Sequence, residues 1–294
     1  MKKVTFDTKE INSRKKIYTN FKKLNIKNVN QLFYYEKIHN FSDLTNAVNF
    51  YISENIRHYG KKNKYISLYK SVDEIYKLDN ITPNGLILPT EKTNFAYNFL
   101  VKIIFQSLEK ITPYIESAVP PLVRIKNSSK NLKNRPYSTY KMHSDAWVGL
   151  YGDAVISMGL DGDLENNGVE FNLPNKTSKD FFKKINDYDE GANKYLSAKK
   201  IRVLKKGEWV LLDHAVLHKS VQQKKFKPRL SIDFGIKLKH EYKKKILGGG
   251  DKKRFHYHNI KDYLNLGTDT FIKTTRKIVK KNIITTHEFI KLKK

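Results

Sequence analysis

The segment TYKMHSDAWVG, residues 139–149, contains two side chains that can bind a metal ion, His143 and Asp145. If the segment is a strand, side chains two positions apart point to the same face and can bind one ion together. A third ligand must come from elsewhere, and EWVLLDHAVLHKSV offers His214 and His218. Two histidines and one carboxylate leave the remaining positions of a metal open to other ligands. Alone the motif is weak, because His-x-Asp pairs are common at protein surfaces.

A second polar pair follows on the segment KPRLSIDFGI. Arg229 lies eleven residues after His218, and Arg229 and Ser231 alternate with apolar residues, as the two faces of a strand would. A guanidinium can donate two hydrogen bonds to one carboxylate, and a neighbouring hydroxyl can supply a third. The pair therefore predicts a carboxylate-binding site, the alternative being an ordinary ion pair of Arg229.

Together, His143-x-Asp145, His218 and Arg229-x-Ser231 resemble the Fe(II)/2-oxoglutarate-dependent dioxygenases, particularly the phytanoyl-CoA-dioxygenase-like branch. Residues 206–236 follow the order of features in that family's later strands: a Gly-acidic turn, a hydrophobic strand, a histidine followed by a small hydroxyl residue, and the Arg-x-Ser strand.

The string HSDAWVG is also similar to a subgroup found in bacterial carbohydrate and antibiotic-sugar clusters. The resemblances cover roughly residues 120–240. One departure is that Gln222 and Gln223 stand where family members commonly carry Asn after the distal histidine.

The resemblance implies a cofactor and a co-substrate. His143, Asp145 and His218 would hold Fe(II), and 2-oxoglutarate would chelate the iron while Arg229 and Ser231 bind its far carboxylate. With O₂, the implied reaction releases succinate and CO₂ and by default hydroxylates a substrate C–H bond. Four further residues flank the site in sequence and fit either co-substrate contact or core packing: Arg124, Tyr137, Tyr140 and Trp147.

The resemblance also favours His218 over His214 as the distal ligand, because His218 has the family's separation from Arg229. Two histidines at i and i+4 on a helix, as in zinc peptidases, need Glu directly after the first histidine. Position 215 is Ala, so that pattern is excluded.

The elements that must position these residues fall into three regions, which we predict to be a helical N-terminal region (1–118), a catalytic core (119–240) and a basic, mainly helical extension (241–294). Helical spacing of apolar residues is clearest in residues 28–38, 43–56 and 94–115. Short β-like runs separated by turn residues predict strands in the core, at residues 122–126, 154–160, 168–174, 200–204, 208–212 and 229–238.

Many short strands of this kind predict a mainly β core of the jelly-roll type, and the resemblance implies a cupin-like double-stranded β-helix with helical additions at both ends. Residues 248–254, GGGDKKR, are interpreted as a flexible joint after that core.

Composition limits the chemistry. The 294 residues include no cysteine, which excludes disulfides, thiolate nucleophiles and iron–sulfur clusters, so a metal must be held by His, Asp or Glu. No run of eighteen apolar residues or signal-like N-terminus occurs, and we expect a soluble, cytoplasmic protein without a membrane span.

The net charge of +28 makes nucleic acid a candidate partner. The charge is uneven, however, because residues 141–193 contain 5 Lys and 10 acidic groups and so have a net charge of −5. We favour a small-molecule hydroxylase acting on a sugar or other metabolite. The alternatives are a hydroxylase or demethylase acting on nucleic acid or protein, and a non-catalytic β-barrel binding protein.

Overall fold

The structure is a computed structural model that describes residues 8–60, 67–127, 136–148, 152–174, 181–194, 199–221, 227–239, 256–279 and 282–292. The helices are α1 (Thr8–Ile17), α2 (Phe41–Tyr59), α3 (Leu68–Tyr76), α4 (Asn94–Gln106), α5 (Tyr188–Lys194) and α6 (Ile260–Leu264). Short 3-10 helices span Thr19–Lys23, Glu91–Thr93, Thr112–Tyr114 and Asp145–Val148. The strands are β1 (Lys27–Asn28), β2 (Phe33–Lys37), β3 (Leu86–Ile87), β4 (Ile115–Ala118), β5 (Leu122–Lys126), β6 (Ala154–Gly162), β7 (Val169–Leu173), β8 (Lys199–Val203), β9 (Glu208–Asp213), β10 (Leu217–Ser220), β11 (Arg229–Leu238), β12 (His258–Asn259), β13 (Thr270–Val279) and β14 (Asn282–Lys291).

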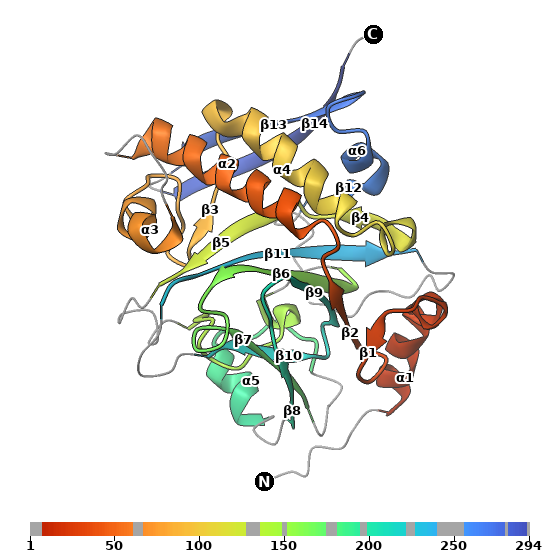
Figure 1. Cartoon of the computed structure of the whole chain (residues 1–294). Coiled ribbons are helices and arrows are strands. Elements are labelled where there is room, and N and C mark those ends of the chain that lie inside the picture. Colours follow the sequence, from red (N-terminus) through yellow and green to blue (C-terminus); the bar gives the residue numbers. More distant parts are fainter. Residues whose placement is uncertain are drawn as a thin grey trace.

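Within the described residues the fold is mainly antiparallel β-sheet (Figure 1). The large sheet has the strand order β1-β2-β9-β6-β11-β4-β12, with β5 paired to β11 and β3 paired to β5. A second sheet has the order β10-β7-β8, and β13 and β14 form a separate hairpin. The strands come from distant parts of the chain, so the sheets bring together residues far apart in sequence.

The two faces of the large sheet have different coverings. Helices α2 and α4 lie over one face (Figure 1). There Phe105 of α4 meets Phe234 of β11 with ring centroids 5.7 Å apart. The small sheet packs on the opposite face, where Phe33 of β2 contacts Phe171 of β7 with centroids 5.1 Å apart. Because β11 alternates, its apolar side chains pack under the helices and its polar side chains point between the sheets.

The strands expected between residues 122 and 238 are present as β5, β6, β7, β8, β9 and β11, which confirms the mainly β character of the core. The short strand β10 was not expected. The expected helices at 43–56 and in the first part of 94–115 are present as α2 and α4. The expected flexible joint at residues 248–254 lies outside the described residues.

Two helical predictions are wrong. The segment 28–38 contains β2, which pairs with β9 inside the large sheet. Its Phe33 is buried against Phe171 of β7, and its Tyr34 is buried against Tyr18 and Phe21. The C-terminal extension, over its described residues, contains one short helix and the long hairpin β13–β14. The β-branched residues of TFIKTTRKIV favour this strand over a helix.

None of the helices in the described ranges combines the length and the apolar composition that crossing a bilayer requires.

Candidate metal centre

A single backbone bridge brings two of the candidate ligands together. The amide of His143 donates to the carbonyl of His218 over 2.9 Å, and the amide of His218 donates to the carbonyl of His143 over 2.8 Å. Residues directly opposite in such an antiparallel pair project to the same side. Their imidazole centroids are accordingly 4.2 Å apart.

Asp145 reaches the same place through a turn. His143 forms an isolated bridge, and a 3-10 helix begins at Asp145, so this segment is not the strand on which the alternation of His143 and Asp145 depended. Ser144 stabilises the turn, because its hydroxyl donates to the carbonyl of His214 over 2.6 Å and accepts from the amide of Ala146 over 3.1 Å. The turn, and not strand alternation, therefore returns Asp145 toward the histidines.

One ligand atom from each of His143, Asp145 and His218 lies within 4.8 Å of the other two. Nε2 of His218 lies 3.7 Å from Oδ1 of Asp145. The backbone carbonyl of Lys141 lies 2.7 Å from Nδ1 of His143, which leaves Nε2 of that imidazole for a metal. This group can bind a metal ion, and it is the triad expected from the sequence.

The electrostatics of His143 suit a metal ligand. Burial, and after it the neighbouring His218, lower the pKa of His143 well below its ordinary value. The imidazole is therefore neutral at pH 7, which is the form that binds metals.

An aromatic lid covers His143 on one side. The ring of Tyr188, at the start of α5, stacks on His143 with centroids 4.3 Å apart and an interplanar angle of 16°. Lys141 holds this segment through ion pairs with Asp187, at 2.8 Å, and Asp189, at 2.5 Å. Lys141 thus orients His143 through its carbonyl and positions α5 through its side chain.

His214 is close to the triad but outside it. It is 4% exposed, and neither ring nitrogen has a hydrogen-bond partner within the described structure. The preceding residue, Asp213, accepts hydrogen bonds from Arg14 over 2.5 Å and from Tyr18 over 2.7 Å. The ion pair between Arg14 and Asp213 connects α1 to the turn that contains His214. Because the carbonyl of His214 accepts from Ser144, α1 also supports the segment that carries His143 and Asp145.

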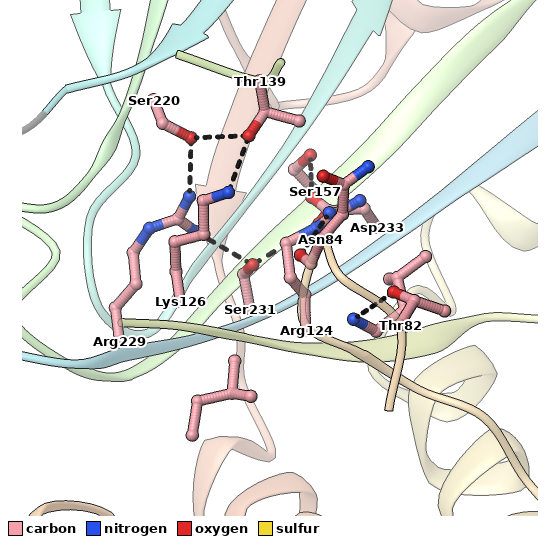
Figure 2. A network of polar contacts seen from close by, with 12 residues as sticks. Thr82, Asn84, Arg124, Lys126, Thr139, Ser157, Ser220, Arg229, Ser231 and Asp233 are labelled. Atoms are coloured by element: carbon pink, nitrogen blue, oxygen red, sulfur yellow. Dashed lines mark hydrogen bonds and ion pairs between the residues drawn. The ribbon is translucent and has the colours of Figure 1, made fainter. Parts of the chain in front are cut away.

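A buried guanidinium, that of Arg229 on β11, contacts Ser220 of β10, two residues after His218 (Figure 2). Arg229 is 1% exposed, and it donates to the hydroxyls of Ser231 over 3.0 Å and Ser220 over 3.4 Å. Its Nε has no hydrogen-bond partner in the described part of the chain. Burial lowers the pKa of Arg229 to about 10, so the side chain is still charged at neutral pH.

A second cation, which the sequence reasoning missed, lies beside Arg229. Lys126 is opposite Arg229 in the β5–β11 register and is 1% exposed. Its ammonium donates to the hydroxyl of Thr139 over 2.8 Å (Figure 2). The same ammonium lies 4.7 Å from the ring centroid of Tyr140. The only signal in the sequence was a lysine at the end of an apolar strand, which ordinarily marks a solvent-exposed strand end.

Arg124 is engaged in a different contact. Its Nε donates to Asp233 over 2.8 Å, and its Nη1 donates to the carbonyl of Asn84 over 3.1 Å (Figure 2). Burial alone would raise the pKa of Asp233, but Arg124 and the Ser157 hydroxyl overcome burial and hold that pKa below its ordinary value. The carboxylate of Asp233 also accepts a hydrogen bond from Ser231 over 3.4 Å, and Ser231 contacts Arg229. Arg124 is therefore linked to Arg229 only indirectly, through Asp233 and Ser231.

This pair predicts a pH-dependent stability difference. Asp233→Asn should lower the free energy of unfolding at pH 7 by about 2 kcal/mol, because it removes a charge-assisted contact in a largely buried site. Because the pKa of Asp233 is lower in the folded protein, its ionised carboxylate stabilises the fold at pH values above the ordinary pKa of 3.8. This stabilisation is lost as the pH falls through the pKa of the folded state. Urea unfolding should therefore show that the difference in the free energy of unfolding between the wild type and Asp233→Asn is smaller at about pH 3 than at neutral pH. A difference independent of pH would contradict this assignment.

The other flanking residues have identifiable packing contacts. Trp147 is 1% exposed and its indole N–H donates to the carbonyl of Phe181 over 2.6 Å. Tyr137 is 38% exposed and donates to the carbonyl of Ile185 over 2.9 Å. Gln222 and Gln223 lie outside the described residues.

Comparison with known proteins gives only distant likenesses. No protein-family model matches the chain, and a search of curated proteins finds no match either. Among solved structures, the α-ketoglutarate-dependent non-haem epimerase SnoN from nogalamycin biosynthesis is 11% identical with a TM-score of 0.40, covering 69% of this chain and 76% of its own. The carbocyclase SnoK from the same biosynthesis is 10% identical with a TM-score of 0.40, covering 70% and 79%. A prolyl hydroxylase from Trichoplax adhaerens is 11% identical with a TM-score of 0.38, covering 79% and 94%. Similarity at this level carries no argument about activity.

Proposed function

We propose that this chain is a non-haem Fe(II)- and 2-oxoglutarate-dependent oxygenase that hydroxylates a small molecule, on a core that closes as a double-stranded β-helix. The observation that carries the proposal is the juxtaposition of two sites. A His-Asp-His group able to bind a metal is linked to a buried guanidinium, because Arg229 donates to Ser220, two residues after His218 on β10. The resemblance of these same residues to the phytanoyl-CoA-dioxygenase-like branch supports it.

The donor set fits Fe(II). Two imidazoles and one carboxylate are the ligands of the facial triad in non-haem Fe(II) oxygenases, and no thiolate is available in this chain. Nδ1 of His143 is already engaged with a backbone carbonyl, the outer contact that normally fixes the orientation of a metal-bound histidine. His143, Asp145 and His218 would therefore hold the iron and leave the remaining coordination positions to the co-substrate and O₂.

The anchor for 2-oxoglutarate lies one strand repeat from the iron site. His218 and Ser220 lie two residues apart on β10, so their side chains share a face and are separated by about 7 Å. This separation is comparable with the length of a five-carbon diacid. Bound through its 2-oxo acid end at the metal, the co-substrate would place its far carboxylate at Ser220 and Arg229.

Several groups would hold that carboxylate. Arg229 can donate two parallel hydrogen bonds, Ser231 and Ser220 can add hydroxyl contacts, and Lys126 supplies a second positive charge. Tyr140 lies against the Lys126 ammonium and would close that side of the site. Arg124, paired with Asp233, would not contact this carboxylate directly but would help to position Ser231 through Asp233.

Iron, 2-oxoglutarate and O₂ together supply oxidation of a substrate C–H bond, with release of succinate and CO₂. The protein orients the reactants and excludes water. Tyr188 shields His143, while Asp145 and His218 keep 22% and 15% of their side chains exposed. The substrate would therefore approach from the Asp145 and His218 side, and a sugar or other metabolite is the class we favour.

The direct test is binding of Fe(II) and then of 2-oxoglutarate under anaerobic conditions. We expect a metal-to-ligand charge-transfer absorbance on addition of 2-oxoglutarate, followed by a screen for succinate release with nucleotide sugars, lipids, peptides and oligonucleotides. A protein that binds Fe(II) but never 2-oxoglutarate is a different kind of metalloprotein. One that binds neither is the non-catalytic binding protein.

The charge of +28 keeps nucleic acid as the second candidate substrate. We expect only weak binding of DNA or RNA at physiological salt, with a steep salt dependence of roughly −0.7 to −0.9 per phosphate neutralised on a log–log plot. Fluorescence anisotropy across a salt series would measure it. Tight, sequence- or structure-selective binding at physiological salt would make the nucleic-acid hydroxylase the better proposal.

A further inference from the structure

Three phenylalanines form an exposed aromatic cluster on the outer surface of α2 and α4. Phe50, Phe95 and Phe99 are 38%, 74% and 44% exposed. The ring of Phe50 meets each of the other two edge-on, with centroids 6.3 Å apart in both pairs. A contiguous aromatic surface of this kind on helices that already bury their other faces is typical of an interaction site.

The charges around the cluster are balanced, in contrast to the strongly basic chain. The charged residues of α2 are Asp43, Glu54 and Arg57, and those of the 3-10 helix Glu91–Thr93 and α4 are Glu91, Lys92 and Lys102, which makes three acidic and three basic residues. A net charge of +28 would repel another basic chain and would attract nucleic acid or an anionic membrane. A locally neutral aromatic surface favours neither polyanion, and it lowers the repulsion that a second copy of the chain would meet.

The stripe along α4 is complementary to itself. Glu91 precedes Phe95 by one turn and Lys102 follows Phe99 by three residues, so the two charges lie at opposite ends of the stripe. Glu91 lies in the 3-10 helix that precedes α4, and Lys102 lies within α4. Neither forms an ion pair with any residue that the structure describes.

We propose that this surface binds a second copy of the chain across a two-fold axis that sets α4 antiparallel to α4 of the partner. An axis passing midway between Phe95 and Phe99 places Phe95 of each copy opposite Phe99 of the partner subunit. The same axis places Glu91 of each copy beside Lys102 of the partner subunit, at both ends of the interface. A two-fold interface requires this kind of self-complementarity.

The size of the surface predicts a weak dimer. Helices of 19 and 13 residues are about 28 and 20 Å long, and each is about 10 Å wide. The paired surface is therefore on the order of 500 Å² per copy, below the roughly 800 Å² per partner of a standard stable interface. We expect this dimer to dissociate in the micromolar range. Because α2 and α4 cover the face of the large sheet opposite the metal centre, dimer formation leaves that centre open (Figure 1).

Sedimentation equilibrium of the full chain, across a roughly hundredfold range of concentration centred on the micromolar, tests the dimer. Phe95→Ser and Phe99→Ser should each weaken it at least tenfold, and both positions are exposed enough for the fold to be retained. Glu91→Lys and Lys102→Glu should each weaken it by placing like charges together, and the double variant Glu91→Lys/Lys102→Glu should restore it. Val29→Ser, at a 47% exposed site between β1 and β2, should change nothing.

Three results would overturn the proposal: a monomer at every concentration, a dimer insensitive to the phenylalanine changes, or charge reversals that add instead of cancelling. Sedimentation with vesicles of phosphatidylcholine, with and without phosphatidylserine, tests the alternative that the aromatic cluster binds a membrane. Vesicle binding by a monomer that Phe95→Ser abolishes would assign the cluster to a membrane. Fe(II) and 2-oxoglutarate binding should be equal in all of these variants, so this proposal and the oxygenase proposal can fail separately.

Discussion

Replacing any one of the three candidate metal ligands is expected to abolish iron-dependent turnover. His143→Ala, Asp145→Ala and His218→Ala each remove one of three bonds that hold the ion. Loss of even a hydrogen-bond partner behind a ligand weakens metal binding by about 10- to 100-fold, so loss of a ligand should exceed about a hundredfold. Titration calorimetry with Fe(II) under anaerobic conditions measures this loss without requiring the substrate to be known.

His214→Ala is the matched control for these variants. His214 is a buried histidine four residues before His218, and its contact with Ser144 is made by its backbone carbonyl, which the substitution retains. We expect Fe(II) affinity within a few-fold of the wild type. If His214→Ala lost the metal while His218→Ala kept it, the distal ligand would be His214 and the bridge between His143 and His218 would be purely structural.

The second large effect is expected at Arg229. Arg229→Ala should weaken 2-oxoglutarate binding by roughly tenfold to a hundredfold or more, because a charge-assisted bidentate contact contributes on the order of 1.5–3 kcal/mol. Arg229→Lys keeps the charge but loses the forked geometry, so its affinity should lie between those of Arg229→Ala and the wild type. Titration of the anaerobic Fe(II) protein with 2-oxoglutarate, followed by charge-transfer absorbance, gives the affinities, and Fe(II) binding should be little changed.

Lys126 makes this test sharper. Lys126→Met keeps most of the side-chain volume and removes the charge, and it should weaken 2-oxoglutarate less than Arg229→Ala because a single ammonium cannot fork onto a carboxylate. If Arg229→Ala titrates like the wild type while Lys126→Met does not, the carboxylate lies on Lys126. If neither variant changes the titration, Arg124 becomes the next candidate. Absence of 2-oxoglutarate binding even in the wild-type protein would remove the dioxygenase proposal itself.

The expectation about the strands succeeded because strand signals are local. Alternating polar and apolar residues in RLSIDFGIKL predict a strand with two different faces, and β11 has them. Local signals failed where burial depends on distant partners. Residues 33–37 carry the aromatic residues of a strand inside a segment with helical spacing, and pairing with β9 decides between the two.

For the candidate metal site, the sequence predicted which residue types could bind a metal but not how they are arranged in space. His143 and Asp145 could be recognised because few residue types bind metals and no cysteine competes with them, whereas the choice of His218 over His214 came from the family resemblance. The reason expected for their proximity was alternation along one strand. The structure achieves it by a backbone bridge to β10 and a 3-10 turn held by Ser144.

By itself the sequence determined the ligand chemistry, the basic charge, the mainly β core and the two faces of the Arg229 strand, because residue type and short periodicity are properties of a few consecutive positions. Only the tertiary structure decided that Lys126 lies opposite Arg229, that Arg124 is bound to Asp233, and that Tyr188 stacks on His143. These contacts join strands and a helix up to 109 residues apart. The register between such segments is set by how the whole core packs, since a one-residue shift would turn every side chain of a strand to the opposite face.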